Sequence, residues 1–262
     1  MPAELTSYRN PLLKDVRRAI GRGGLTSSGC CIAETFHLLE EALRSECAIH
    51  TVICSESVHG TVERRIGGLR NIEIIRVPDS LYSEISATES SQGVMALIKP
   101  PVWELDQLVR GEPLVMILDG VQDPGNAGAI LRAAEAFGAS GVIFIKGSVN
   151  PYNPKAIRAS AGSVFRVPLV SGLDPTLALA AISQRKIDLY AAMPKASLTI
   201  AEANLQRRCA FVIGSEGRGV SAQLQGAALD LRIPTSRVES LNAAVAAGIL
   251  LYEAWRQRTA VS

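Results

Sequence analysis

The sequence has no long hydrophobic run and no regular cysteine spacing. No apolar stretch approaches the roughly 20 residues that a membrane helix needs, and residues 1–5 lack the pattern of a signal peptide. Its five cysteines follow no regular spacing, so we predict no disulfide framework. We therefore expect a cytoplasmic globular protein.

Several familiar catalytic motifs are also missing. The three histidines, His37, His50 and His59, form no pair at ligand spacing, and no CxxC occurs, so we predict no metal site. The absence of a G-x-S-x-G motif excludes a serine hydrolase with a nucleophile elbow. A glycine-rich turn at residues 119–128 follows a predicted strand, but it has neither the G-x-G-x-x-G nor the P-loop spacing. Dinucleotide and nucleoside-triphosphate binding therefore have little support.

What the chain does contain is enough for two folded domains. It has 262 residues, of which 47% are hydrophobic, and its formal net charge of +2 neither demands nor excludes a nucleic-acid partner. Residues 99–113 contain Pro100, Pro101, Gly111 and Pro113, and the double proline cannot continue a helix. We predict one domain at residues 1–100, a linker at 101–113, and a second domain at 114–262.

Short apolar runs alternate with helical patterns on both sides of this linker, which predicts an α/β fold in each domain. In the second domain, residues 114–118 and 142–145 are continuous apolar runs, as expected for parallel strands covered on both faces. Further elements are predicted in that domain: a helix at 127–137, strands at 187–192, 209–213 and 229–233, and a final helix at 240–258.

Three loops that follow predicted strands carry the polar candidates of the second domain. The first contains Asn126 and leads to Arg132, the second is residues 214–219, and the third is residues 234–242. In open α/β sheets, ligands bind beyond the carboxyl ends of the strands, where such loops meet. Each loop also has a purely structural interpretation, because Asn126 or Ser240 could cap a helix and the glycines could form a tight turn.

In this order, the three loops resemble the signature motifs of the SpoU/TrmH family, which belongs to the SPOUT superfamily of RNA methyltransferases. The first motif is NAGAILRAAEAFG at residues 126–138, and the second is IGSEGRG at residues 213–219. The third is Ile-Pro at 233–234 followed by ESLNAAVA at 239–246, with Ala243 in place of the usual valine. A subsidiary stretch at residues 153–163 also looks like the family.

The resemblance implies a SPOUT-type parallel sheet with a C-terminal trefoil knot, a small N-terminal α/β RNA-binding domain, and a homodimer. It implies S-adenosylmethionine as methyl donor and a ribose 2′-hydroxyl of structured RNA as acceptor, with rRNA favoured over tRNA. It assigns catalysis to five residues: Arg132, Asn126, Glu216, Ser240 and Asn242. It assigns donor binding to four residues: Gly214, Gly217, Ile233 and Leu241. The first 100 residues resemble the family's appended RNA-binding domain less closely, because Glu34-Thr35 stands in place of the usual Glu-Gly.

The role of Arg132 has two interpretations. By resemblance it lies close to the 2′-hydroxyl and is a candidate base, yet a guanidinium group normally keeps its proton in proteins. It could instead hold a phosphate and stabilise charge. Two other function classes stay open, a non-catalytic RNA-binding relative and a small-molecule α/β enzyme. The five catalytic candidates speak against the first, and the extra domain and missing nucleotide motifs speak against the second.

The first domain has a basic segment near its start. Asn10 and Pro11 predict the N-cap and first residue of a helix that stops at Gly21. We predict that three arginines of this segment bind RNA: Arg17, Arg18 and Arg22. A second basic cluster is Arg64, Arg65 and Arg70. The alternative is a merely solvated helix face.

The final helix has a broad apolar face. Its larger residues are Val245, Ile249, Tyr252 and Trp255. This face either packs within the chain or contacts a second copy in the homodimer that the resemblance implies.

Overall fold

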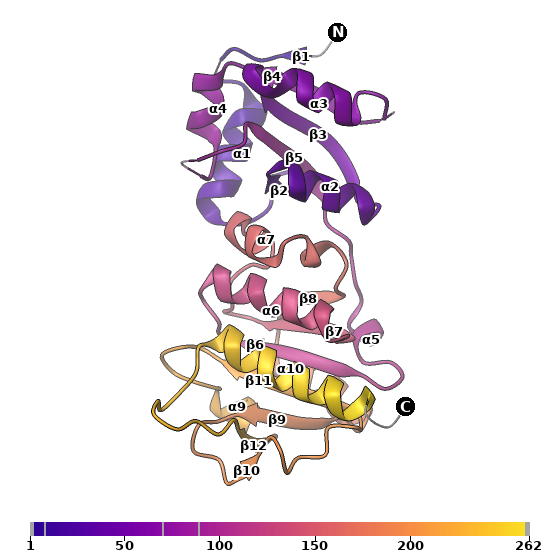
Figure 1. The fold of residues 1–262 in the computed structure, drawn as a ribbon, viewed down its shortest axis with the longest axis vertical. Coiled ribbons are helices and arrows are strands. Elements are labelled where there is room, and N and C mark those ends of the chain that lie inside the picture. The colour runs from indigo at the N-terminus through magenta and orange to yellow at the C-terminus, as the bar shows by residue number, and fades with distance from the viewer. Residues whose placement is uncertain (1–2, 8, 70, 89, 260–262) are drawn as a thin grey trace. The chain divides into compact units, whose positions relative to one another are not determined.

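The structure is a computed structural model that describes residues 3–7, 9–69, 71–88 and 90–259. The described chain forms two compact units (Figure 1). Unit 1 contains the residues up to Pro101 together with Tyr152–Phe165, and unit 2 contains Val102–Pro151 and the residues from Arg166 onward. Within the described ranges, no helix is long and apolar enough to cross a membrane.

Unit 1 is built on a five-stranded mixed sheet with the order β1-β4-β3-β5-β2. Its strands are β1 Ala3–Glu4, β2 Cys31–Glu34, β3 Ala48–Ser55, β4 Glu73–Val77 and β5 Val94–Lys99. Strand β5 runs antiparallel to β2 and β3, and the other pairs are parallel. The helices are α1 Pro11–Arg22, α2 Phe36–Arg44, α3 His59–Ile66, α4 Asp79–Ile85 and α7 Pro154–Ser160, with 3₁₀ turns η1 Glu56–Val58 and η2 Ser163–Phe165.

Helix α1 begins where the sequence predicts. The Asn10 side chain accepts a hydrogen bond from the Leu12 amide at 2.9 Å, and Pro11 occupies the first helical position. The helix ends at Arg22, one residue beyond the predicted stop, because Gly23 adopts the left-handed conformation that closes a helix (φ 62°). Its apolar side, including Leu13 and Val16, is buried in the unit 1 core.

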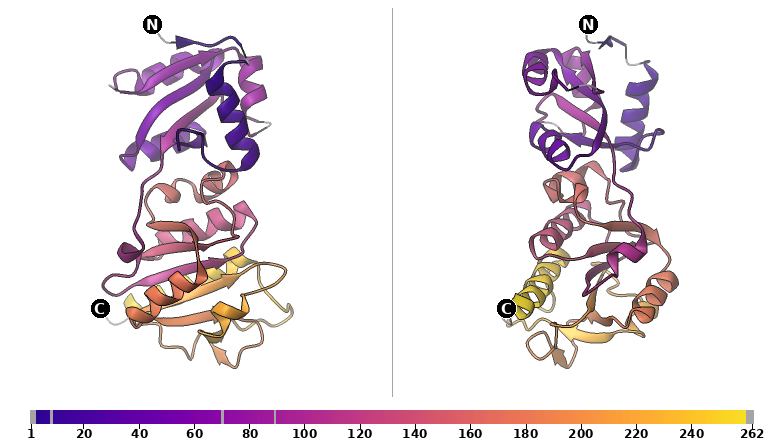
Figure 2. Two further views of the ribbon diagram at one scale, coloured as in Figure 1. Left: turned by 180° about the vertical axis from the view of Figure 1, so that it is seen from behind. Right: turned by 90° about the vertical axis from the view of Figure 1, so that its right-hand side faces the viewer.

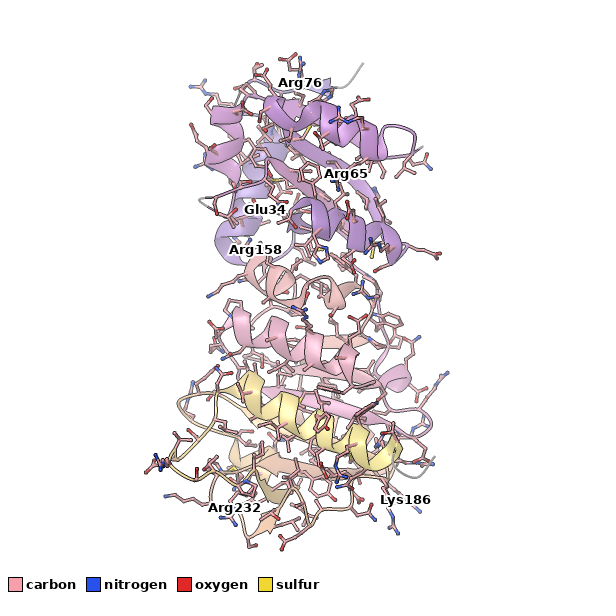
Figure 3. All side chains as sticks on the ribbon, viewed as in Figure 1. Glu34, Arg65, Arg76, Arg158, Lys186 and Arg232 are labelled. Atoms are coloured by element: carbon pink, nitrogen blue, oxygen red, sulfur yellow. The ribbon has the colours of Figure 1, made fainter. Side chains whose placement is uncertain are left out.

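Unit 1 also includes a segment from the middle of the chain, Tyr152–Phe165, which the sequence assigns to the second domain. Helix α7 packs against β2, and Arg158 donates to Glu34 at 3.4 Å (Figure 3). The Glu34 carboxylate is only 3% exposed and also accepts from the Ala87 amide at 2.8 Å. Gly162 has φ +93°, and a Cβ there would lie 2.6 Å from the Cβ of Glu41, so this position requires glycine.

Unit 2 is an α/β structure on a seven-stranded, fully parallel sheet, as predicted. The strand order is β10-β12-β9-β11-β6-β7-β8. The strands are β6 Leu114–Asp119, β7 Gly141–Ile145, β8 Leu169–Leu173, β9 Asp188–Ala192, β10 Leu198–Thr199, β11 Cys209–Gly214 and β12 Leu229–Arg232. Every residue of β6 and β7 is buried, which explains why these strands read as continuous apolar runs.

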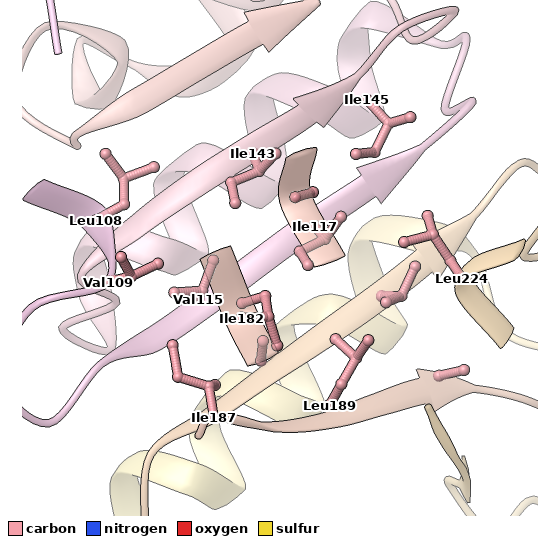
Figure 4. Packing of buried hydrophobic residues seen from close by; sticks show 14 of the residues in the cluster. Leu108, Val109, Val115, Ile117, Ile143, Ile145, Ile182, Ile187, Leu189 and Leu224 are labelled. Atoms are coloured by element: carbon pink, nitrogen blue, oxygen red, sulfur yellow. The ribbon is translucent and has the colours of Figure 1, made fainter. Parts of the chain in front are cut away.

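Helices cover both faces of this sheet (Figure 2). They are α5 Leu105–Leu108, α6 Pro124–Ala136, α8 Pro175–Gln184, α9 Ala222–Gln225 and α10 Ala243–Thr259. Helices α6 and α10 pack side by side on one face, and α8 contacts α9 and β7. Residues of α5, α8 and α9 join the strands in a shared apolar core (Figure 4). Leu108 and Val109 are buried in that core, and all of the predicted linker except Pro101 is part of unit 2.

Candidate active site

The three polar loops leave the carboxyl ends of parallel strands of unit 2. The first follows β6 and the second follows β11, and these strands are neighbours with Gly214 opposite Asp119. The third loop follows β12, which lies beyond β9 in the sheet and leads into α10. The sheet therefore brings the three predicted motifs to one edge, as the rule for open α/β sheets requires.

A chain of side-chain hydrogen bonds joins the three motifs, with Asn126 near the start of α6. The Asn126 amide donates from Nδ2 to Oε1 of Glu216 at 2.7 Å, and its Oδ1 accepts from Nδ2 of Asn242 at 3.0 Å. Oδ1 of Asn242 accepts in turn from the backbone amides of Ala244 and Val245, at 2.9 and 3.2 Å. Three of the five predicted catalytic residues thus share one network, which is fixed to the start of α10.

Asn126 and Ser240 do not cap the helices, so the purely structural interpretation of these two residues does not hold. Asp123 caps α6, since its Oδ1 accepts from the Asn126 amide at 2.7 Å. Asn242 caps α10, which begins at Ala243 rather than at Ser240. The side chain of Asn126 is therefore available for Glu216 and Asn242, and Ser240 lies in the loop that precedes the cap.

Arg132 and Ser240 lie outside this network. Arg132 is exposed on α6, and the described part of the chain offers its guanidinium no hydrogen bond or ion pair. Ser240 is exposed and lines a cavity beside the network. The structure thus leaves both side chains open to an incoming molecule.

The glycine-rich second loop is a tight turn. A Cβ on Gly214 would lie 2.0 Å from the carbonyl carbon of Gly219 and 2.2 Å from the amide nitrogen of Val220. Ser215 and Gly219 exchange backbone hydrogen bonds of 3.1 and 2.9 Å, and Gly219 has φ +68°. Only glycine fits at Gly214, and the loop it permits forms one wall of the cavity.

The cavity has a volume of about 690 Å³, within the range of about 300–1,000 Å³ that is usual for small-molecule sites. Three of the four predicted donor-binding residues line it: Gly214, Ile233 and Leu241. Gly217 lies in the turn but does not line the cavity in the described structure. Three predicted catalytic residues also line it: Glu216, Ser240 and Asn242.

Residues after β9 complete the cavity, and sequence reasoning missed them. They are Met193, Pro194, Lys195 and Ala196. No motif marks this segment, and the only signal was its place directly after a predicted strand. Asp119 was also missed, although it directly follows an apolar run. Its buried carboxylate accepts from the Ser221 amide at 2.6 Å and holds the second loop against β6.

The cavity's chemistry suits a partly apolar ligand that carries positive charge. Leu231, Ile233 and Leu241 offer apolar surface for a flat ring. Its ionisable side chains are three carboxylates and one ammonium: Asp230, Glu216, Glu239 and Lys195. Carboxylates favour a cationic group such as a sulfonium or an amine. Among the described residues, no group of three or more His, Cys, Asp or Glu side chains could hold a metal ion.

Comparisons with known proteins agree with this arrangement. Residues 113–252 match the SpoU rRNA methylase family, and residues 10–96 match an MRM3-like substrate-binding domain. The chain is 34% identical to an uncharacterized tRNA/rRNA methyltransferase of Synechocystis sp., over 99% of this chain and 96% of that protein. It is 28% identical to the 23S rRNA (guanosine(2553)-2′-O)-methyltransferase RlmP of Bacillus subtilis, over 95% of this chain and 98% of that protein.

Solved structures show the same likeness. The SpoU methyltransferase AviRb of Streptomyces viridochromogenes in complex with the cofactor AdoMet matches with a TM-score of 0.88 and 27% identity, over 96% of this chain and 99% of that chain. An AdoMet-bound rRNA methyltransferase of Sinorhizobium meliloti matches with a TM-score of 0.83 and 28% identity, over 97% of each chain.

The fold, the cavity and these matches define an RNA methyltransferase with an appended substrate-binding domain. The chain belongs to the SpoU rRNA methylase family. The family resemblance of its three motifs is thereby confirmed.

Proposed function

We propose that this protein transfers a methyl group from S-adenosylmethionine to a ribose 2′-hydroxyl of structured RNA, with rRNA as the favoured substrate. Family membership supports the reaction, and the rRNA 2′-O-methyltransferases among its relatives support the substrate. The observation that carries the proposal is the cavity of about 690 Å³, which adjoins the Glu216–Asn126–Asn242 network and is lined by two of its members.

The donor-binding role falls to residues of the second and third loops. Gly214 lets the backbone close tightly, while Ile233 and Leu241 supply apolar walls. Gly217 lies in the same turn, outside the cavity lining. Bound S-adenosylmethionine supplies a methyl group that its sulfonium has already activated. The protein must therefore align the acceptor oxygen and accommodate the hydroxyl proton.

Five residues are proposed to handle the acceptor. Arg132 and Ser240 meet the incoming nucleotide, and Asn126, Glu216 and Asn242 hold the local geometry. We assign Arg132 to phosphate binding and charge stabilisation, because a guanidinium keeps its proton in proteins and is exposed here to water. The position of Ser240 on the cavity wall supports a contact with the ribose.

A direct test is to incubate the full chain with methyl-labelled donor and unmodified rRNA, and then to map 2′-O-methylation at nucleotide resolution. We expect label on the ribose of one or a few nucleotides, and none with an Asn126→Ala variant that still binds donor. Label only on bases would refute the ribose assignment. Donor and RNA binding without any transfer would indicate a non-catalytic relative, and turnover of a small molecule alone would indicate the third class.

Unit 1 is proposed to supply RNA affinity and selection, and residues 114–262 the chemistry. The match of residues 10–96 to a substrate-binding domain supports this division. Three arginines of α1 are exposed opposite its buried side, so they can reach phosphates: Arg17, Arg18 and Arg22.

A second basic cluster lies in and after α3. Arg64 and Arg65 are exposed on α3, and Arg70 lies outside the described residues. Replacing the three α1 arginines by glutamine should weaken RNA binding and flatten its salt dependence; unchanged binding would contradict the assignment.

A homodimer through α10 is proposed on the exposure of its apolar face. Val245, Ile249, Tyr252 and Trp255 are 50%, 36%, 47% and 41% exposed. The two aromatic rings also contact Phe137, the C-cap residue of α6, and extend the patch. Such contiguous apolar surface usually marks an interface. Light scattering at micromolar concentration should give a dimer mass, and Ile249→Glu should give a monomer. A monomeric wild-type chain would refute the proposal.

We propose two further features because the chain belongs to this family. One is the trefoil knot, supported by the path of the chain from β11 out to β12, beyond β9, and back to α10 beside α6. The other is a cytoplasmic site of action, supported by an rRNA substrate.

A further inference from the structure

Six of the eleven arginines in unit 2 have their guanidinium groups engaged within the protein. Five of them form ion pairs with acidic side chains: Arg110, Arg166, Arg185, Arg208 and Arg256. Arg258 donates instead to backbone carbonyls, among them those of Leu205 and Pro113. These guanidinium groups are engaged within the protein.

Two arginines on the cavity's own loops differ from this pattern. Arg218 and Arg237 are both exposed, and no hydrogen bond or ion pair to either guanidinium occurs within the part of the chain that the structure describes. Three other arginines also have no ion pair in the described ranges, but none of them lies on a loop that lines the cavity. Arg132 is in α6, Arg207 precedes β11, and Arg232 is in β12. Arg218 and Arg237 alone belong to the loops whose neighbouring residues line the donor cavity.

The backbone fixes both arginines in place. The amide of Arg218 donates to Oγ of Ser215 at 3.1 Å, inside the turn that Ser215 and Gly219 close. Arg237 lies in a turn closed by the hydroxyl of Thr235, which donates to the carbonyl of Val238 at 2.7 Å. The backbones of Arg218 and Arg237 are therefore held in turns on two different loops.

Acidic side chains near these arginines are directed elsewhere. Glu216, two residues before Arg218, accepts from Asn126 and lines the cavity. Glu239, two residues after Arg237, lines the same cavity. The carboxylates thus face the donor and the reaction, while the nearby cations are left for a ligand of opposite charge outside the cavity.

The RNA acceptor itself carries negative charge. A ribose within an RNA strand has a phosphate on each side, so any ribose that brings its 2′-hydroxyl to the donor brings two phosphates with it. A guanidinium binds phosphate through paired N–H donors, with defined geometry as well as charge. Arg218 and Arg237 lie on separate loops whose other residues line the cavity, so each can take one of these phosphates beside the contact proposed for Arg132.

We propose that Arg218 and Arg237 bind the RNA phosphates on either side of the target nucleotide. This inference rests on the proposed function and adds a second RNA contact, on the catalytic unit, to the one proposed for α1. Unit 1 selects the RNA, and the two arginines position the ribose. They are positioning residues, since they contact the backbone and not the reacting oxygen.

The test compares Arg218→Gln, Arg237→Gln and the double variant with Arg207→Gln. The last is a matched control, because Arg207 is exposed, has no ion pair in the described ranges and lies outside the cavity lining. For each protein, donor affinity is measured by calorimetry without RNA. RNA affinity is measured from 50 to 200 mM salt, and KM and kcat are measured with rRNA.

We expect each single variant to lower the slope of log K against log salt by about 0.7–0.9, and the double variant by about 1.5. This corresponds to roughly a threefold smaller loss of RNA affinity per arginine over that salt range. KM for RNA should rise while donor affinity stays at the wild-type value. Arg218→Lys should restore the slope because an ammonium also neutralises a phosphate, and Arg207→Gln should match wild type.

Wild-type slopes in both Gln variants would overturn the proposal. So would a Lys variant as weak as the Gln variant, or a parallel loss of donor affinity, because either would indicate a distorted loop rather than a lost phosphate contact. Failure of the proposed function is a separate outcome. In that case the wild-type chain transfers no methyl group to RNA, whatever the slopes are.

Discussion

Replacing Asn242 by aspartate separates the two roles of this side chain. Its Oδ1 caps α10 by accepting from the amides of Ala244 and Val245, and its Nδ2 donates to Oδ1 of Asn126. Aspartate has the same shape and caps a helix as well as asparagine does. It lacks the amide hydrogens, however, so it places an oxygen against the oxygen of Asn126.

Asn126 cannot relieve this contact by turning its amide over. Rotation would point its oxygen at Glu216, and the 2.7 Å hydrogen bond to that carboxylate would be lost instead. The variant therefore loses one hydrogen bond whichever way Asn126 turns, at about 0.5–1.5 kcal/mol for partly exposed groups, and gains repulsion between facing oxygens. With 1.36 kcal/mol for each factor of ten, we expect kcat to fall about tenfold.

The free energy of unfolding distinguishes loss of the hydrogen bond to Asn126 from loss of the α10 cap. Asn242→Asp keeps the cap and loses only the hydrogen bond to Asn126, so its free energy of unfolding should fall by about 0.5–1.5 kcal/mol. Asn242→Ala removes the cap as well, and its free energy of unfolding should fall by about 1 kcal/mol more. Steady-state methyl transfer at saturating RNA measures kcat in parallel. An aspartate variant with a kcat within twofold of wild type would show that the hydrogen-bonded network does not serve the reaction.

Three further changes test other parts of the structure. Gly214→Ala should abolish donor binding in calorimetry, because its Cβ would meet backbone at 2.0 Å, whereas Gly217→Ala, with open space around it, should bind donor normally. Arg132→Ala should lower the transfer rate more than tenfold, about 1.4 kcal/mol, without changing donor affinity; retention of more than about a tenth of the rate would exclude a catalytic role. Arg158→Ala leaves the carboxylate of Glu34, 3% exposed, without its cation. It should destabilise unit 1 by about 1–3 kcal/mol in urea unfolding, and an unchanged midpoint would contradict this.

Local signals in the sequence were enough to predict much of the fold. Asn10 and Pro11 mark the start of α1 because a cap and a fixed φ act within one turn of the helix. The apolar runs of β6 and β7 are continuous because helices cover both faces of the sheet. Order and spacing of the three motifs indicated the site, and the parallel sheet explains why they meet.

Other features depend on contacts between distant residues, which no local pattern specifies. The place of Tyr152–Phe165 in unit 1 depends on pairs such as Glu34 with Arg158, which are 124 residues apart. Met193 and its neighbours join the cavity because β9 lies between β11 and β12, an order that periodicity does not reveal. The network through Asn126 likewise needed coordinates, because sequence alone did not show that Asp123 would take over the cap.

The discontinuous make-up of unit 1 has a consequence for the order in which the protein is made. A ribosome releases Pro101 long before it reaches Phe165, and at about 5–20 residues per second the 64 intervening residues take about 3–13 s. During this interval Glu34 has no Arg158, and Gly162 has not yet reached Glu41. Unit 1 therefore cannot finish folding when its first 101 residues have emerged, because it waits for a piece of chain that is synthesised only after β6, α6 and β7 of unit 2. A fragment that ends near residue 100 will lack this piece altogether, so unit 1 should be produced with residues 152–165 supplied, for example by a linker that joins them to Pro101.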